Sequence, residues 1–321
     1  MTEPASQSVS VVIPCYNGMP YLPEALDSVL AQTHRPAQII VVDDGSIDAS
    51  ADCVLDFRKR FADQPIELIQ QDNAGESAAR NAGIKASTST WIAQVDADDW
   101  WDPRKLELQL QAAVERGVEC VLVHTGQITH DHDGHVDASS LKRAGERVGW
   151  CTDKLIEPVG ISHSSVMARR DTLNRIGGYD ADLRHAVDID VYFRLSAEGV
   201  FAFVAEHLTH YRIHGGQTSW HHKLEQIRHH HAVIRRFFDS HTDLAGRIGH
   251  DRINAALAEH VASKLESFWW NRRLAEFRQL LAFADEQGYQ SESLGTWRDK
   301  AHWPDWMVRL KGRVSGAGSG S

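Results

Sequence analysis

Three carboxylates stand within four residues, at Asp96, Asp98 and Asp99, directly after the apolar run 91–95. A short apolar run of this kind predicts a buried strand whose C-terminal end carries the acids. Carboxylate oxygens are the ligands that Mg²⁺ and Mn²⁺ take in proteins, often together with substrate phosphates. The stretch therefore indicates a divalent-cation site. An acidic loop that caps the next helix is the alternative for such a triplet taken alone.

Four apolar runs predict buried strands, at residues 8–14, 39–42, 66–70 and 91–95. The segments between them place apolar residues at helical spacing. This alternation predicts an α/β fold with a doubly wound, mostly parallel sheet and helices on both faces. Ligands of such sheets bind beyond the carboxyl ends of the strands. Those ends carry polar or acidic stretches at residues 14–17, 43–46, 72–73 and 96–99.

Two common phosphate-binding motifs are absent from the sequence. No Gly-x-Gly-x-x-Gly follows the first expected strand, and Gly-x-x-x-x-Gly-Lys-Ser/Thr does not occur. A nucleotide diphosphate bound at this rim of the sheet would therefore need a metal ion to neutralise its charge.

The composition of the 321 residues is that of a globular protein with a formal net charge of -10. This charge argues against nucleic acid as a partner, because phosphate backbones are bound by Lys and Arg. No apolar run reaches the roughly 18 residues of a membrane span, and the first ten residues lack a signal-peptide pattern. The four cysteines have no Cys-x-x-Cys spacing, which favours free thiols. The expected location is the cytoplasm.

The alternation breaks after an expected helix at 103–116 and a strand at 118–123. Residues 124–160 are polar and irregular, and a solvated loop is expected there. Its histidines match no metal-ligand spacing; they are His124, His130, His132 and His135. Further strands are expected at 165–168 and 201–204, and a helix from Val187. Asp188 lies in the first turn of that helix, where the dipole favours a carboxylate, so capping alone would explain it.

From about residue 221 the apolar spacing is helical throughout, which predicts packed helices. We therefore expect a catalytic domain at 1–220 and a helical region at 221–321. Residues 303–313 combine tryptophans with Arg and Lys. This composition fits an amphipathic helix in peripheral contact with the inner face of the cell membrane, and equally an ordinary surface helix.

Four motifs follow one another in the first hundred residues: VSVVIP at 9–14 with YN at 16–17, VVDDGS at 41–46, NAG at 73–75 with ARNAG at 79–83, and DADD at 96–99. Together they resemble the family 2 glycosyltransferases, which have the GT-A fold. The similarity continues more loosely through GGYD at 177–180, DIDVYFRL at 188–195 and YRIH at 211–214. Beyond about residue 220 no specific motif extends it.

The resemblance implies transfer of a sugar from a nucleotide-diphosphate donor to an acceptor hydroxyl, with inversion at the anomeric carbon. Uridine or thymidine diphosphate is the expected leaving group, and Mn²⁺ or Mg²⁺ is the expected cofactor. A saccharide or lipid-linked saccharide is the expected acceptor, in the synthesis of a cell-surface polysaccharide or glycolipid.

The resemblance also implies roles for residues of the nucleotide pocket. Pro14 and Tyr16 would line the nucleoside, and Asp44 would accept a hydrogen bond from the base. Arg80 would lie near the diphosphate or the base. Asp96 would contact the ribose.

Metal ligands follow from the same resemblance. Asp98 completes an Asp-x-Asp motif and would bind the metal, with Asp99 as a competing candidate. His214 falls where several family members place a residue near the diphosphate and metal. Manganese is favoured if His214 is a ligand, because imidazole suits softer ions than magnesium.

The general base would be Asp188. The family often has Glu-Asp at this place, whereas this chain has Val187-Asp188, so Asp190 competes for the role. Residues two apart point to different sides of a helix, and only one of the two acids is expected to face the crevice. We choose Asp188.

Three other functions share some of these features. A nucleotidyltransferase would need a glycine-rich, basic phosphate loop after the first strand, and none is present. A receiver-like signalling module would explain the acids at 43–44, but not those at 96–99 or Asp188. A non-catalytic nucleotide-sugar-binding module is the third alternative.

Overall fold

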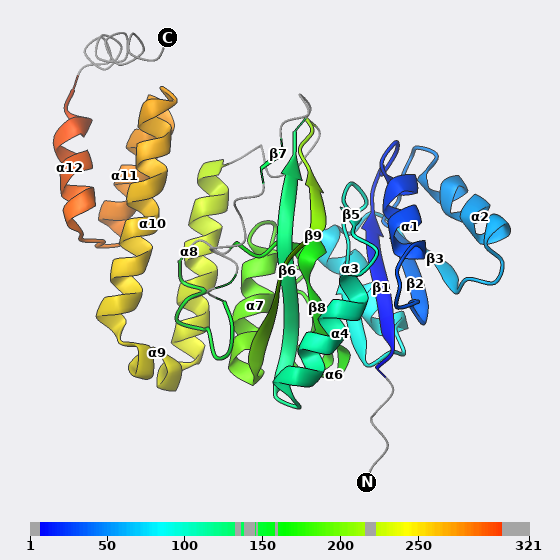
Figure 1. Ribbon diagram of the computed structural model, residues 1–321. Helices are drawn as coiled ribbons and strands as arrows, with labels where there is room; N and C mark the ends of the chain where they lie inside the picture. Colours follow the sequence, from blue (N-terminus) through cyan, green and yellow to red (C-terminus); the bar gives the residue numbers. More distant parts are fainter. Residues whose placement is uncertain are drawn as a thin grey trace, which may run out of the picture. The chain divides into compact units, whose positions relative to one another are not determined.

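The computed structural model describes residues 7–131, 136–137, 145, 147–157, 160–215 and 223–303. The chain divides into two compact units (Figure 1). The first comprises residues 1–155 and 159–220, and the second comprises residues 156–158 and 221–321.

One half of the sheet in the first unit is parallel. Its strands are β1 (Val9–Cys15), β2 (Gln38–Asp43), β3 (Ile66–Gln70) and β4 (Trp91–Gln94), in the spatial order β3-β2-β1-β4. Their side chains are mostly apolar and buried. Because helices cover both faces of a parallel sheet, its strands are continuous apolar runs in the sequence. The parallel strands expected from the sequence are confirmed within one or two residues.

Helices cover both faces of this parallel half. Side chains of α1 (Leu22–Leu30) and α2 (Ser50–Arg60) pack with one face, and α3 (Glu76–Ala86) packs on the other. At Gly83 of α3 a Cβ would come within 2.3 Å of Val12 Cγ1, so only glycine permits this approach to β1. The helix α4 (Lys105–Arg116) also contributes Leu106 to the first face.

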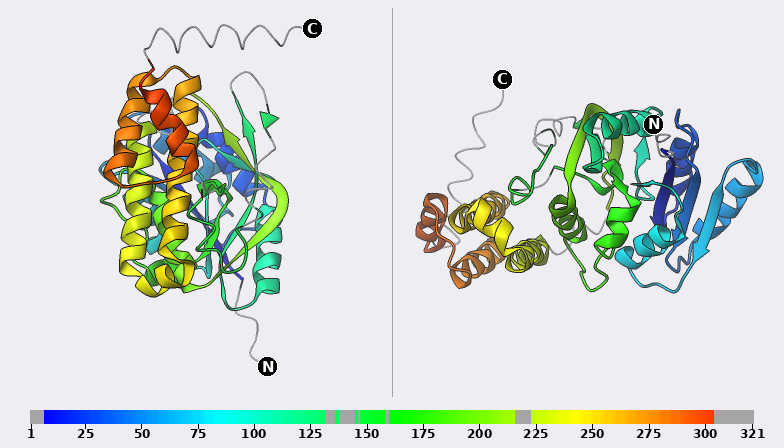
Figure 2. Two further views of the ribbon diagram at one scale, coloured as in Figure 1. Left: turned by 90° about the vertical axis from the view of Figure 1, so that its left-hand side faces the viewer. Right: turned by 90° about the horizontal axis from the view of Figure 1, so that it is seen from below.

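The other half of the sheet is mixed (Figure 2). Here β8 (Met167–Arg169) runs antiparallel between β4 and β6 (Cys120–His130), which pairs in parallel with β9 (Val200–Arg212). The two-residue strand β5 (Trp100–Trp101) pairs with the end of β9, with Trp100 opposite His210. The sequence pattern missed β5, because two residues show no periodicity and their partners are far along the chain.

The expected solvated loop from residue 124 is wrong over its first seven residues. Strand β6 continues to His130, and a short strand β7 (Val136–Asp137) pairs with it. His124 is fully buried, its Nε2 lies 3.0 Å from the Arg147 carbonyl oxygen, and burial lowers its pKa to about 4. Polar side chains in β6 pair across to β9, as Thr125 does with Thr209, and this satisfies them inside the fold. His132 and His135 lie outside the described residues.

Three short elements lead toward the candidate site. They are the 3₁₀ turn η1 (His163–Ser165), α6 (Arg170–Arg175) and α7 (Val187–Glu198). Gly177 and Gly178 end α6 with positive φ angles of 82° and 69°, as the glycine pair predicts. In chain order α6 and α7 lie between β8 and β9, and both helices are green in Figure 1.

The second unit is helical in its described part, as expected. Its helices are α8 (Lys223–Ser240), α9 (Thr242–Ile248), α10 (His250–Trp270), α11 (Leu274–Glu286) and α12 (Glu292–Ala301). Apolar residues at helical spacing, such as Leu257, Val261 and Leu265 of α10, form its core. Residues 304–313 of the expected amphipathic segment lie outside the described residues. Among the described residues, no helix is both long and apolar enough to span a membrane.

Candidate functional site

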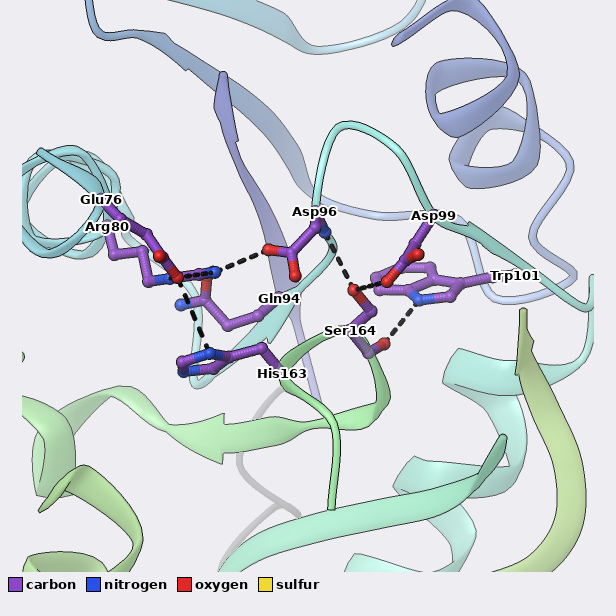
Figure 3. Close-up of polar contacts among 8 residues, drawn as sticks. All are labelled: Glu76, Arg80, Gln94, Asp96, Asp99, Trp101, His163 and Ser164. Atoms are coloured by element: carbon purple, nitrogen blue, oxygen red, sulfur yellow. Dashed lines mark hydrogen bonds and ion pairs between the residues drawn. The ribbon is translucent and has the colours of Figure 1, made fainter. Parts of the chain in front are cut away.

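The three acids that follow β4 converge at the carboxyl end of the sheet. Asp96, Asp98 and Asp99 each offer a carboxylate oxygen, and these oxygens all lie within 4.8 Å of one another. Figure 3 shows two of these side chains, Asp96 and Asp99, on either side of Ser164. Like charges this close are costly unless cations or donors surround them, so the neighbours of each acid decide its chemistry.

Asp99 is the buried member of the cluster. Its Oδ2 accepts a hydrogen bond of 2.5 Å from Ser164 Oγ, and its Oδ1 accepts one of 3.0 Å from the Arg212 backbone N–H. Burial, followed by repulsion from the two neighbouring acids, raises its pKa. Both oxygens are thus held by protein donors, and Asp99 fixes the start of β5 against the end of β9.

Asp98 is more accessible and pairs with an imidazole. Its Oδ2 lies 2.9 Å from His214 Nε2, and the His214 ring packs 4.7 Å from the ring of Tyr21. Among the described residues, the three carboxylates form the donor set, and carboxylate oxygens suit Mg²⁺ and Mn²⁺. The residues present therefore fit the expected divalent cation, with Asp98 as the side chain best placed to hold it and His214 in contact with Asp98.

Asp96 is oriented by a buried arginine. Arg80 is only 1% exposed, and its Nη2 donates to Asp96 Oδ1 at 2.6 Å and to Glu76 Oε1 at 2.7 Å. Its Nη1 donates to Gln94 Oε1 at 3.2 Å. Burial of Asp96 opposes ionisation, but the Arg80 guanidinium prevails and holds the pKa of this carboxyl below its usual value. Arg80 therefore positions Asp96, and its expected proximity to the diphosphate or base stays a prediction.

Ser164 connects two of the acids and was not singled out from the sequence. Its hydroxyl accepts a hydrogen bond from the Asp96 backbone N–H at 3.1 Å and donates to Asp99 (Figure 3). Its carbonyl oxygen accepts a hydrogen bond of 2.7 Å from Trp101 Nε1. A serine in a short 3₁₀ turn, more than sixty residues from the acids, carries no local signal for this role.

Asp44 organises the loop that precedes α3. It is buried, and its carboxylate accepts hydrogen bonds from the backbone N–H groups of Ala74 at 2.9 Å and Gly75 at 2.8 Å. Gly45 has a φ of +77°, and a Cβ there would lie 2.9 Å from the Asn73 nitrogen, so this turn requires glycine. The expected bond from Asp44 to a nucleobase stays a prediction.

The end of β1 supplies the remaining expected pocket residues. Pro14 pairs with Val42 of β2, and Tyr16 follows with 54% of its surface exposed. An exposed aromatic ring at the carboxyl end of a parallel strand is available to stack on a planar base. Their role in binding a nucleoside stays a prediction.

The two acids of α7 lie in different environments. The buried carboxylate of Asp190 pairs with the Arg194 guanidinium one turn later, which also donates to the Ile176 carbonyl oxygen at 2.7 Å. Asp188 is half-buried, and burial, followed by the charge of Glu76, raises its pKa to about 6. An acid with this pKa is ionised at neutral pH and still holds a proton well, as a general base requires.

Contacts link Asp96 to the helix that carries Asp188. Arg80 binds Asp96 and Glu76, His163 Nδ1 lies 3.9 Å from Glu76 Oε1, and the His163 ring centroid lies 5.8 Å from that of Tyr192, one turn after Asp188. Arg80 opposes the raised pKa of Asp188, and the same guanidinium binds Asp96 directly. The negative charges of both acids also help to raise the pKa of the buried Tyr192 hydroxyl, although burial is the main cause. The structure thus brings together acids that are about ninety residues apart in the sequence.

A family model described as glycosyl transferase family 2 matches residues 10–174. An uncharacterized glycosyltransferase of Nostoc sp. is 33% identical over 213 residues, which cover 64% of this chain and 65% of that protein. Another, of Rickettsia prowazekii, is 30% identical over 220 residues, covering 67% of this chain and 66% of that protein. These alignments thus span about two thirds of the length of each relative.

The fold is shared with a solved structure. The crystal structure of S. aureus TarS 1–349 in complex with UDP-GlcNAc superposes with a TM-score of 0.63, covering 97% of this chain and 92% of that chain. The sequence identity is 16%, so this similarity concerns the fold alone. The GT-A-like architecture expected from the motifs, with an added helical region, is confirmed.

Proposed function

Because this chain belongs to glycosyl transferase family 2, we propose that it moves a sugar from a nucleotide-diphosphate donor to an acceptor hydroxyl, with inversion at the anomeric carbon. The observation that carries the proposal is the grouping of Asp188 with the acids that follow β4 around one buried arginine, Arg80. A base and a cation site at one rim are what this reaction needs.

Asp188 is the proposed general base. An acceptor hydroxyl is a weak nucleophile at neutral pH, and a carboxylate within hydrogen-bond reach takes its proton as the new C–O bond forms. Such a base contributes roughly 10²–10⁴-fold to the rate. The raised pKa of about 6 keeps Asp188 ionised at pH 7 and close to the range where proton transfer is efficient.

Asp98 and His214 are the proposed side chains for a divalent cation, with Mn²⁺ favoured over Mg²⁺ by the imidazole. Such an ion supplies positive charge to the oxygens of the departing diphosphate. Asp96, oriented by Arg80, is the proposed partner of the ribose hydroxyls, and Pro14 and Tyr16 are the proposed nucleoside contacts.

Uridine diphosphate is the favoured carrier, with thymidine diphosphate as the second choice. The solved TarS structures contain UDP and UDP-GlcNAc, which supports a uridine donor for a chain of the same fold. A saccharide or lipid-linked saccharide is the proposed acceptor, in cell-surface polysaccharide or glycolipid synthesis at the cytoplasmic side of the membrane. Residues 303–313 are the proposed peripheral contact.

A donor screen tests this function. Uridine and thymidine diphosphate sugars are added with Mn²⁺, and the melting temperature and the released nucleoside diphosphate are measured. We expect at least one donor to raise the melting temperature and to release nucleoside diphosphate only with active protein. Release of pyrophosphate from a sugar phosphate and nucleoside triphosphate would instead identify a nucleotidyltransferase.

A non-catalytic binding module is the alternative that this screen also addresses. Such a module would show a donor-dependent rise in melting temperature without any release of nucleoside diphosphate. The raised pKa of Asp188 favours an enzyme over a binding module, because a general base needs a pKa near the working pH and a binding module does not.

A further inference from the structure

A second carboxylate, that of Glu76, contacts a residue packed on the helix that carries Asp188. The His163 Nδ1 lies 3.9 Å from Glu76 Oε1, and the His163 ring packs against Tyr192 of α7. Glu76 stands in the first turn of α3, directly after Gly75, whose N–H is held by Asp44. Its side chain is 52% exposed, and its negative charge helps to raise the pKa of Asp188, after burial. Glu76 is therefore an exposed carboxylate whose charge reaches the proposed base.

Arg80 fixes one carboxylate oxygen of Glu76 and leaves the other available for a ligand. Its Oε1 accepts hydrogen bonds from Arg80 Nη2 at 2.7 Å and Nε at 3.2 Å (Figure 3). Its Oε2 has no hydrogen-bond partner in the described part of the chain. A carboxylate that is fixed at one oxygen and open at the other is well suited to accept a hydrogen bond from a sugar hydroxyl.

Two buried polar atoms without hydrogen-bond partners among the described residues belong to His163, which contacts Glu76, and to Tyr192 of α7. The His163 side chain is 9% exposed; its Nδ1 lies 3.9 Å from Glu76 Oε1, and its ring centroid lies 5.8 Å from that of Tyr192. Tyr192 is one helical turn after Asp188. Within the described residues, His163 Nε2 and the Tyr192 hydroxyl have no hydrogen-bond partner. Unpaired buried groups are unfavourable, and a sugar hydroxyl would satisfy them directly or through one water.

The charged side chains around Glu76 carry a net negative charge. Arg80 is shared by Glu76 and Asp96, so one guanidinium faces two carboxylates, and Asp188 adds a third. His163 is neutral at working pH, since burial lowers its pKa to about 3. Carboxylates grouped in this way accept hydrogen bonds from the hydroxyl groups of a sugar, whereas they repel a further carboxylate.

On the basis of the proposed function, we propose that Glu76, His163 and Tyr192 form the subsite for the transferred sugar. This subsite takes an uncharged hexose and rejects a uronic acid, and Glu76 is the residue that makes this distinction. It extends the proposed site beyond the nucleotide and the cation to the class of sugar.

Calorimetry on the full chain with Mn²⁺ tests the subsite. UDP and dTDP are titrated first, and the diphosphate that binds is then compared with its glucose and glucuronic acid esters. We expect the wild type to bind the glucuronate ester about tenfold or more weakly than the glucose ester, which corresponds to about 1.4 kcal/mol. In Glu76→Gln this ratio falls to about threefold or less. The affinity for the diphosphate alone, measured for both proteins, is the reference that removes any change transmitted through Arg80 to the nucleotide pocket.

The choice of variants separates charge from folding. Glutamine at 76 keeps an oxygen for Arg80 and removes only the charge. Glu115→Gln, on the exposed surface of α4, is the matched control and leaves the ratio unchanged. Tyr192→Phe removes a buried hydroxyl for which the described part of the chain offers no partner, so the melting temperature of this variant without ligand is equal or higher. It nevertheless binds the glucose ester about threefold or more weakly.

Each outcome decides between the two proposals. Absence of binding by both diphosphates rejects the proposed function, and the subsite with it. Binding of a diphosphate with a glucose-to-glucuronate ratio near one, or with a ratio that Glu76→Gln does not change, rejects the subsite alone.

Discussion

Replacing Asp188 by asparagine should stabilise the protein while it removes activity. The pKa of Asp188 is raised from the ordinary 3.8 to about 6, chiefly by burial and then by the charge of Glu76. Above pH 6 this group is charged in both the folded and the unfolded state. The charge destabilises the folded state, because there the carboxylate is removed from water. Asparagine has nearly the same shape and carries no charge, so this cost disappears.

The magnitude follows from the pKa shift. Raising the pKa from 3.8 to about 6 corresponds to about 3 kcal/mol of free energy of unfolding at pH 7. Between pH 6 and 4 the folded protein takes up a proton before the unfolded chain does, so the wild type recovers this loss as the pH falls. Only well below pH 3.8 is the group neutral in both states. The advantage of Asp188→Asn should therefore be about 3 kcal/mol at pH 7.5 and less than about 1 kcal/mol at pH 4.

Urea unfolding at several pH values, together with nucleoside diphosphate release, measures both effects. We expect activity to fall by roughly 10²–10⁴-fold in Asp188→Asn, the contribution of a general base. Asp190→Asn is the matched control on the same helix. It breaks a buried pair with Arg194 and should lose about 3–5 kcal/mol of stability at neutral pH.

Two results would refute this reasoning. A gain in stability that is the same at pH 7.5 and pH 4 would show that the charge of Asp188 is not its cause. Full activity in Asp188→Asn would remove the general base from the mechanism, whatever the effect on stability.

The remaining predictions concern the cation, the pH optimum, the helical unit and the C-terminal segment. Asp98→Ala should abolish metal-dependent donor binding, and unchanged affinity in calorimetry with and without Mn²⁺ would reject Asp98 as a ligand. Below about pH 6, kcat/KM should fall about tenfold per pH unit as Asp188 is protonated, and a flat profile down to pH 5 would contradict its role. Burial lowers the pKa of His231 to about 2 and of His260 to about 3, so only the unfolded chain gains protons below pH 6.5. The melting temperature of the helices, followed by circular dichroism, should therefore drop as the pH falls to 4, and His260→Gln should flatten this dependence. Deletion of residues 304–321 should reduce sedimentation with anionic vesicles, and intact chain that never sediments would remove the membrane contact.

The location of the candidate site could be predicted from the sequence because it depends on local patterns. Apolar runs fix β1 to β4, and the carboxyl ends of parallel strands lie at one edge of a sheet. The acids at 96–99 therefore had to lie near Tyr16 and Asp44. Glycines that tolerate positive φ, such as Gly45, mark the turns in the same local way.

The partners of each acid depend on contacts between distant residues. Ser164 joins Asp96 to Asp99 across more than sixty residues, and the Arg212 backbone reaches Asp99 across 113. No periodicity or motif in the sequence encodes such pairs, because they arise when β5, β9 and η1 pack against the end of β4.

The gathering of carboxylates at one rim of an α/β sheet could be predicted from local patterns, since apolar runs mark the strands and the acids follow directly after them. Which of these carboxylates stay ionised, which are fixed and which remain open depends on packing that local patterns do not encode. Burial and charged neighbours set the pKa of a group, and both depend on the packing of segments far apart in the chain. Arg80 is buried between Glu76 and Asp96 for this reason, and its charge opposes the rise in the pKa of Asp188.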